Sequence, residues 1–150
     1  MNELNYGEWA ERAAIENLRG RLATGDFLLG QANTLLSITL LGIGGAMSFG
    51  AKVVLPAAGP VAWGACAVAL WLCVVGAALT LQCIATRTTP ALFNEPGNLY
   101  RPDLHLTELE IRQFEMQNIQ GRSGDAKGLN ARSARWLDRC RYAVVATPLI

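Results

Sequence analysis

The chain has 150 residues, of which 51% are hydrophobic, and its 13 basic and 12 acidic side chains nearly cancel. This charge balance argues against a dedicated nucleic-acid-binding protein, which needs a broad basic surface. The four cysteines form no CxxC pair and no Cys/His spacing typical of a zinc site, and neither their number nor their placement suggests a disulfide framework. We therefore expect neither a metal ion nor a cofactor.

Residues 1–26 are predicted to form an amphipathic helix, because apolar residues recur at nearly helical spacing and charged residues fall mainly on the other side. The apolar positions are Trp9, Ala13, Leu18 and Leu22. Gly25 and Asp26 are expected to interrupt this helix, with Asp26 capping the next one. Because so many mixed-charge residues come first, the apolar stretch that follows is expected to be a retained span and not a cleaved signal peptide.

Two stretches without an ionisable side chain follow, with 25 residues in 27–51 and 26 residues in 61–86. A bilayer core about 30 Å thick takes roughly 20 helical residues, so each stretch is long enough to span it. The link between them contains Lys52, Pro56 and Pro60. We expect residues 27–86 to form a transmembrane hairpin. Since more Lys and Arg residues flank the hairpin than lie in its link, both termini are expected on the cytoplasmic side of a bacterial inner membrane.

Small and polar residues form a stripe along the first span at i+3 and i+4 steps. The members of this polar stripe are Gly30, Asn33, Thr34, Ser37, Gly44 and Ser48. Such residues let helices approach closely and form hydrogen bonds between helices. The stripe is a candidate pore lining, and packing within the hairpin explains the same pattern.

Two further tracks repeat the small-xxx-small spacing. They are Gly42, Ala46 and Gly50 in the first span, and Ala65, Ala69, Cys73 and Ala77 in the second. A single helix pair needs one contact face on each helix. The additional tracks therefore predict neighbours beyond the intramolecular partner, and we expect a homo-oligomer that packs through them.

Residues 87–150 are predicted to form a cytoplasmic helical region with an apolar tail. Thr107 and Glu110 form a capping box that predicts a helix over about 106–120. Gly121 is expected to end this helix, and residues 123–125 to cap a second one. Because residues 103–115 carry a net charge of −3 and residues 122–141 of +4, the two helices are expected to form an antiparallel pair, within or between subunits.

The second of these helices is predicted to carry an apolar stripe flanked by arginines. The stripe contains Leu129, Ser133, Trp136, Leu137, Cys140 and Val144, and the arginines are Arg132, Arg135 and Arg139. We favour contact of these arginines with anionic lipid head groups or another subunit, and keep a phosphate-rich ligand or RNA as the alternative. The tail 142–150 is too short to span a bilayer, so it lies in the interface, packs on the hairpin or begins a further span.

No residue pattern predicts an enzyme. His105 is the only histidine and is expected to be a solvated residue near a helix start. The sequence contains no G-x-S-x-G motif and no phosphate-binding glycine loop, and no carboxylate pair has a spacing that fixes a mechanism.

The layout resembles that of small bacterial anti-phage membrane effectors, the two-transmembrane proteins of the Pycsar and SLATT types. The resemblance covers the leading helix, the hairpin and the trailing segments 130–137 (NARSARWL) and 142–144 (YAV). It implies an oligomer that permeabilises or disrupts the inner membrane when a nucleotide-based or RNA-guided sensor triggers it. Because the chain carries no sensor domain of its own, a separate protein or ligand is expected to activate it.

The sequence thus predicts an all-α membrane protein, with a two-helix transmembrane hairpin, an amphipathic N-terminal helix and a C-terminal cytoplasmic helical pair. Its predicted function is that of an oligomeric inner-membrane effector that forms a pore or depolarises the membrane in anti-phage defence. Two alternatives remain open. One is a non-conducting membrane anchor that docks a cytoplasmic enzyme or RNA complex, and the other is a phage holin.

Overall fold

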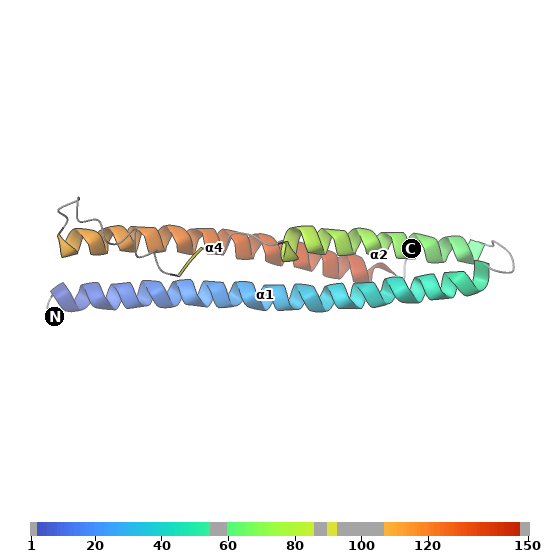
Figure 1. Cartoon of the computed structure of the whole chain (residues 1–150), viewed down its shortest axis with the longest axis horizontal. Helices are drawn as coiled ribbons and strands as arrows, with labels where there is room; N and C mark the ends of the chain where they lie inside the picture. The colour runs from blue at the N-terminus through green and yellow to red at the C-terminus, as the bar shows by residue number, and fades with distance from the viewer. Residues whose placement is uncertain (1–2, 55–59, 86–89, 93–106, 148–150) are drawn as a thin grey trace. The chain divides into compact units, whose positions relative to one another are not determined.

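The computed structural model describes residues 3–54, 60–85, 90–92 and 107–147, and its regular elements over these residues are all helical. These elements are α1 (Glu3–Val54), α2 (Pro60–Leu79), the π-helical turn η1 (Thr80–Ile84) and α4 (Glu108–Val145) (Figure 1). Proline at the first position of α2 suits a helix start, because the backbone N–H that proline lacks would have no partner there. The predicted all-α class is confirmed.

The expected interruption of α1 at Gly25 and Asp26 is wrong, because α1 runs through both residues as one helix of 52 residues. Gly25 serves close packing. A Cβ atom at this position would lie 3.0 Å from Oδ1 of Asn130, whose Nδ2 donates a hydrogen bond of 2.6 Å to the backbone carbonyl of Arg21. The absent side chain therefore lets the Asn130 amide reach the α1 backbone.

The predicted C-terminal helical pair is also wrong, because residues 108–145 form the single helix α4. Ile119 and Ala126 lie on either side of the expected turn and are one heptad apart, so a continuous helix places both on one face. Both are buried with Leu18 of α1. This burial stabilises helix through Gly121 and Gly124. The acidic and basic segments meet along the same helix, where Arg122 and Glu115 form a largely buried ion pair of 2.7 Å.

The chain divides into two units. One comprises Met1–Asp26 and Arg87–Ala131 and is called the flanking unit here; the other comprises Phe27–Thr86 and Arg132–Ile150 and is called the hairpin unit. In the flanking unit Leu18 is fully buried and Leu22 packs beside it, as the amphipathic pattern predicts, whereas Trp9 and Ala13 are exposed. The buried face of α1 is completed by Ala14 and Ile15.

In the hairpin unit, α2 lies antiparallel along the second half of α1, and the end of α4 packs against both helices (Figure 1). The buried core comes from all three helices and consists of Ala32, Val75, Leu79, Leu137 and Cys140. Ala143 and Val144 pack against it. The start of the apolar tail therefore packs on the hairpin, which was one of its three predicted placements.

The predicted capping box of α4 is confirmed. The backbone N–H of Thr107 donates to a carboxylate oxygen of Glu110 at 2.8 Å, and the Thr107 hydroxyl lies 2.7 Å from the same oxygen. The N–H of Glu110 reaches the Thr107 hydroxyl at 3.4 Å. These bonds satisfy backbone N–H groups that have no partner within the helix. His105 and most of the predicted connector, residues 93–106, lie outside the described residues.

Candidate functional site: the outward face of α1

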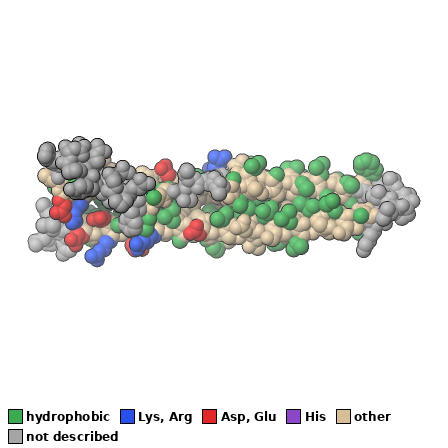
Figure 2. Space-filling model, viewed as in Figure 1, with side chains coloured by type: hydrophobic (Ala, Val, Ile, Leu, Met, Phe, Trp, Pro, Cys, Tyr) green, Lys and Arg blue, Asp and Glu red, His purple; other side chains and the backbone are tan. Residues whose placement is uncertain are grey.

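The apolar stretches of α1 and α2 lie mostly on the surface of the chain. Both helices are long and apolar enough to cross a membrane, and only 11% and 22% of their most apolar windows are buried. Large side chains such as Phe27, Leu41 and Leu70 are exposed. In the face drawn in Figure 2, hydrophobic side chains follow α2 and the second half of α1, and charged side chains gather over the flanking unit. This exposed apolar surface is typical of helices surrounded by lipid.

All six residues of the polar stripe are exposed on α1. Packing within the hairpin therefore does not account for the stripe. Three residues of its second half, Ser37, Gly44 and Ser48, line an open groove together with Leu40, Leu41 and Gly45, with a volume of about 630 Å³. The stripe thus presents small and polar groups to the surroundings of the chain.

Two hydroxyl groups of the stripe, those of Thr34 and Ser37, are bonded to their own helix. Thr34 donates to the carbonyl of Gly30 and Ser37 to the carbonyl of Asn33, each at 3.0 Å. Asn33 differs from them, because its side-chain amide makes no hydrogen bond within the described part of the chain. In a hydrocarbon environment an unpaired amide costs several kcal/mol, of the order of 4 or more. Asn33 therefore favours a neighbour that supplies a donor and an acceptor, either water or a second helix.

The track of Gly42, Ala46 and Gly50, which the sequence assigned to oligomer packing, faces α2 of the same subunit. A Cβ at Gly42 would lie 2.9 Å from Cδ1 of Leu72, and one at Gly50 would lie 3.3 Å from Cβ of Ala65. Gly50 is buried and Ala46 is half-buried. These residues allow close contact between the two helices of the hairpin, so this track packs within the chain.

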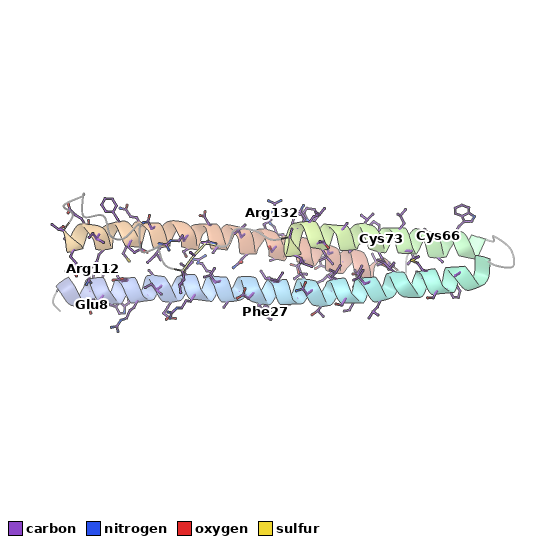
Figure 3. All side chains as sticks on the ribbon, in the orientation of Figure 1. Glu8, Phe27, Cys66, Cys73, Arg112 and Arg132 are labelled. Atoms are coloured by element: carbon purple, nitrogen blue, oxygen red, sulfur yellow. The ribbon has the colours of Figure 1, made fainter. Side chains whose placement is uncertain are left out.

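The first half of the small-residue track of α2 is partly buried, and its second half is exposed. Ala65 and Ala69 are half-buried, and Ala65 meets Gly50 of α1, whereas Cys73 and Ala77 are exposed. Cys73 is labelled on α2 in Figure 3. The second half of this track therefore remains a candidate surface for contact between subunits.

The three arginines of the C-terminal segment are exposed on α4 in the hairpin unit. Arg132 donates to Oε1 of Gln82 at 3.0 Å, and it is labelled beside the end of α2 in Figure 3. The guanidinium carbon of Arg139 lies 5.1 Å from the centre of the Trp136 ring. Within the described residues Arg135 makes neither a hydrogen bond nor an ion pair.

The sequence did not single out three side chains that hold α4 on the hairpin. The indole N–H of Trp71 donates to the carbonyl of Ala143 at 3.2 Å. Gln31 accepts a hydrogen bond from Arg141, and Gln82 accepts one from Arg132. One signal was present, since Gln31 and Gln82 are the only glutamines in the two uncharged stretches.

The chain was compared with protein-family models, with curated proteins and with solved structures, and no match was found in any of the three.

Proposed function

We propose that this chain is the subunit of a helical membrane oligomer that permeabilises the bilayer, with the polar stripe of α1 lining the pore or joining neighbouring subunits. The observation that carries the proposal is the exposure of all six stripe residues on α1. The close-packing glycines, Gly42 and Gly50, are used within the hairpin. A separate face of α1 is thus available for assembly.

Exposure of this stripe to lipid alone is unfavourable. The groove beside Gly44 and Gly45 would leave hydrocarbon contacts unmade, and the Asn33 amide has no partner in the described part of the subunit. A second copy fills the groove and supplies polar partners, with model interhelical hydrogen bonds contributing about 0.6–2 kcal/mol each. A ring of copies would place stripe residues around a lumen, where water satisfies them.

In the cell, we propose that the oligomer acts at the bacterial inner membrane with both termini in the cytoplasm. The excess of arginine outside the hairpin supports this orientation. The resemblance in layout to anti-phage two-transmembrane effectors supports a role in defence, triggered by a separate sensor protein or a nucleotide signal. Loss of membrane potential in infected cells would be the functional outcome.

The test combines leakage and particle size. The purified full chain is reconstituted into liposomes that contain a self-quenched dye, and its mass is measured in detergent. The variants Ser37→Leu and Ser48→Leu make the stripe apolar. The matched controls Ile38→Leu and Met47→Leu alter exposed apolar positions of α1 outside the groove. We expect leakage from the wild type and the controls, and at least tenfold less from the stripe variants.

Particle size separates the two roles of the stripe. An intact oligomer that no longer leaks assigns the stripe to the pore, whereas a monomeric variant assigns it to packing between subunits. A wild type that stays monomeric and releases no dye contradicts the proposal and favours the non-conducting anchor. Expression in bacteria, with and without the neighbouring genes and a phage trigger, distinguishes a triggered effector from a holin, which acts without a sensor.

A further inference from the structure

The side of α4 that carries Arg132, Arg135 and Arg139 begins, at Arg132, at the depth where the hairpin would meet lipid head groups, and it continues toward the middle of α2. The uncharged stretches 27–51 and 61–86 are about 38 Å long as helices, at about 1.5 Å per residue. A hydrocarbon core takes about 30 Å of this length, which leaves roughly five residues in the head-group regions. Gln31 follows the start of the first stretch by four residues, and Gln82 precedes the end of the second by four. Both therefore fall near the boundary between hydrocarbon and head groups.

Two arginines of α4 reach these glutamines. Arg132 donates to Gln82 and Arg141 donates to Gln31. The segment of α4 between them thus runs past this boundary of the hairpin. Trp136 lies in the same segment and is half-buried. Tryptophan and arginine together are typical of side chains at a membrane interface.

Most of the positive charge in this segment is not neutralised within the described residues. Arg141 forms an ion pair of 3.2 Å with Asp138. The partners of Arg132 and Arg139, in contrast, are the neutral side chains of Gln82 and Trp136, and Arg135 has no partner in the described part of the chain. Steps of three and four residues place these three arginines along one side of α4. They form an exposed row, called the arginine row below, with three net positive charges.

We propose that the arginine row binds the phosphate groups of anionic phospholipids at the boundary between hydrocarbon and head groups, where α4 begins to pack along the hairpin. Guanidinium groups donate two parallel hydrogen bonds to phosphate oxygens, and charge-assisted bonds of this kind are stronger than neutral ones. The bond to Gln82 positions one guanidinium and the Trp136 ring positions another, which lowers the entropy lost on binding. The inference rests on the membrane insertion of the two stretches and does not depend on pore conduction.

The test measures lipid preference directly. The full chain is reconstituted in nanodiscs with equal amounts of phosphatidylglycerol and phosphatidylcholine, then released into mild detergent, and the retained lipids are counted by native mass spectrometry. We expect the wild type to retain phosphatidylglycerol preferentially. The single variant Arg135→Gln is expected to lower this preference about fivefold, and the triple variant R132Q/R135Q/R139Q to abolish it.

Two matched triple variants distinguish the effect of the arginine row from the effect of net charge. R132K/R135K/R139K keeps the charge and is expected to retain the preference in reduced form, because lysine lacks the two-pronged donor geometry of arginine. R12Q/R19Q/K127Q removes the same charge from the flanking unit and is expected to behave as the wild type. Far-UV circular dichroism confirms that each variant is folded, and the Arg135→Gln result stands even if the triple variant fails to insert.

Several results would overturn the inference. Equal retention of the two lipids by the wild type is one, and an unchanged preference in Arg135→Gln and in the triple glutamine variant is another. Displacement of the lipid by excess inorganic phosphate would assign the row to a free anion. Binding of a short RNA without any lipid preference would assign it to nucleic acid. A lipid preference in a chain that does not leak dye overturns the pore proposal and leaves this inference standing.

Discussion

The indole N–H of Trp71 donates a hydrogen bond to the backbone carbonyl of Ala143 at 3.2 Å, which joins the middle of α2 to the last turns of α4. The last four carbonyls of a helix have no partner within the helix, and in lipid an unsatisfied carbonyl is costly. The Thr147 hydroxyl donates to the same carbonyl, also at 3.2 Å. The end of α4 is therefore held on the hairpin by hydrogen bonds as well as by apolar contact.

Replacing Trp71 with phenylalanine keeps an aromatic ring and removes the donor. We expect the free energy of opening of residues 137–147 to fall by about 0.5–1.5 kcal/mol, since one hydrogen bond is lost. Hydrogen exchange of these amides in nanodiscs measures the change. The matched control is Trp63→Phe, at a tryptophan that is 73% exposed. Equal exchange in the two variants would show that the Trp71 bond does not hold α4.

Replacing Gly50 with valine tests the close contact within the hairpin. The new Cβ would lie 3.3 Å from Cβ of Ala65, and the two methyl groups beyond it have no room. We expect the free energy of unfolding to fall by about 1–3 kcal/mol relative to Gly64→Val, whose Cβ meets nothing within 4 Å. Thermal unfolding in detergent gives the comparison. A loss of the oligomer with an unchanged subunit stability would return Gly50 to the interface between subunits.

The glycines of α4 distinguish a continuous helix from a helix–turn–helix. Nothing lies within 4 Å of a Cβ built on Gly124 or Gly128, and neither residue has a positive φ angle. Alanine at either position is expected to raise the free energy of unfolding by about 0.8–1 kcal/mol, because glycine is the poorer helix former. Chemical denaturation followed by circular dichroism measures this gain. A loss of stability in Gly124→Ala would instead indicate a turn at residues 121–125.

Alanine at Gly25 is expected to raise the free energy of unfolding by less than alanine at Gly124 or Gly128, or to lower it. Its Cβ would lie 3.0 Å from Oδ1 of Asn130, so the amide that bonds to the Arg21 carbonyl has to move. Gly25→Ala in an Asn130→Ala background removes this conflict, and the ordinary gain of alanine over glycine should return. Chemical denaturation of the wild type, the two single variants and the double variant measures this coupling. Strictly additive changes in the free energy of unfolding would contradict the contact between Gly25 and Asn130.

The capping box predicts a pH dependence at Glu110. The backbone N–H and then the hydroxyl of Thr107 bond to its carboxylate and lower the pKa of Glu110. Since the folded pKa is the lower one, the stabilisation is present above the unfolded pKa and is lost as pH falls through the folded value. Titration by NMR should give a pKa for Glu110 that rises when Thr107 is replaced with alanine. The same pKa in both proteins would show that the box does not form in solution.

Local patterns predicted the helical class, the capping box at Thr107 and the buried stripe around Leu137 and Cys140, because each depends on neighbouring residues. Glycine positions were misleading. Gly121 was expected to end a helix, yet burial of Ile119 and Ala126 on one face outweighs its weak helix propensity.

The same limit applies to the candidate site. Spacing alone located both small-residue tracks of α1, but only tertiary packing decides which track faces α2. Local spacing cannot distinguish the two tracks, because Gly42 and Gly44 are both glycines within a small-residue pattern. They differ only in what lies opposite them, which is Leu72 for Gly42 and nothing within 4 Å for Gly44. Gln31 and Gln82 were overlooked for a similar reason, since their partners lie 110 and 50 positions away in the chain.

The hydroxyls bonded to their own helix have a consequence for how the chain enters the membrane. Thr39 and Thr80 donate to the carbonyls of Leu35 and Gly76, at 2.8 and 2.9 Å, in the same way as Thr34 and Ser37. In the proposed membrane protein, each span would enter lipid with these donors already satisfied by its own backbone, without a second subunit. Under the proposed function, biogenesis separates into two events: a single copy inserts first, and assembly follows as a separate step that a trigger can control.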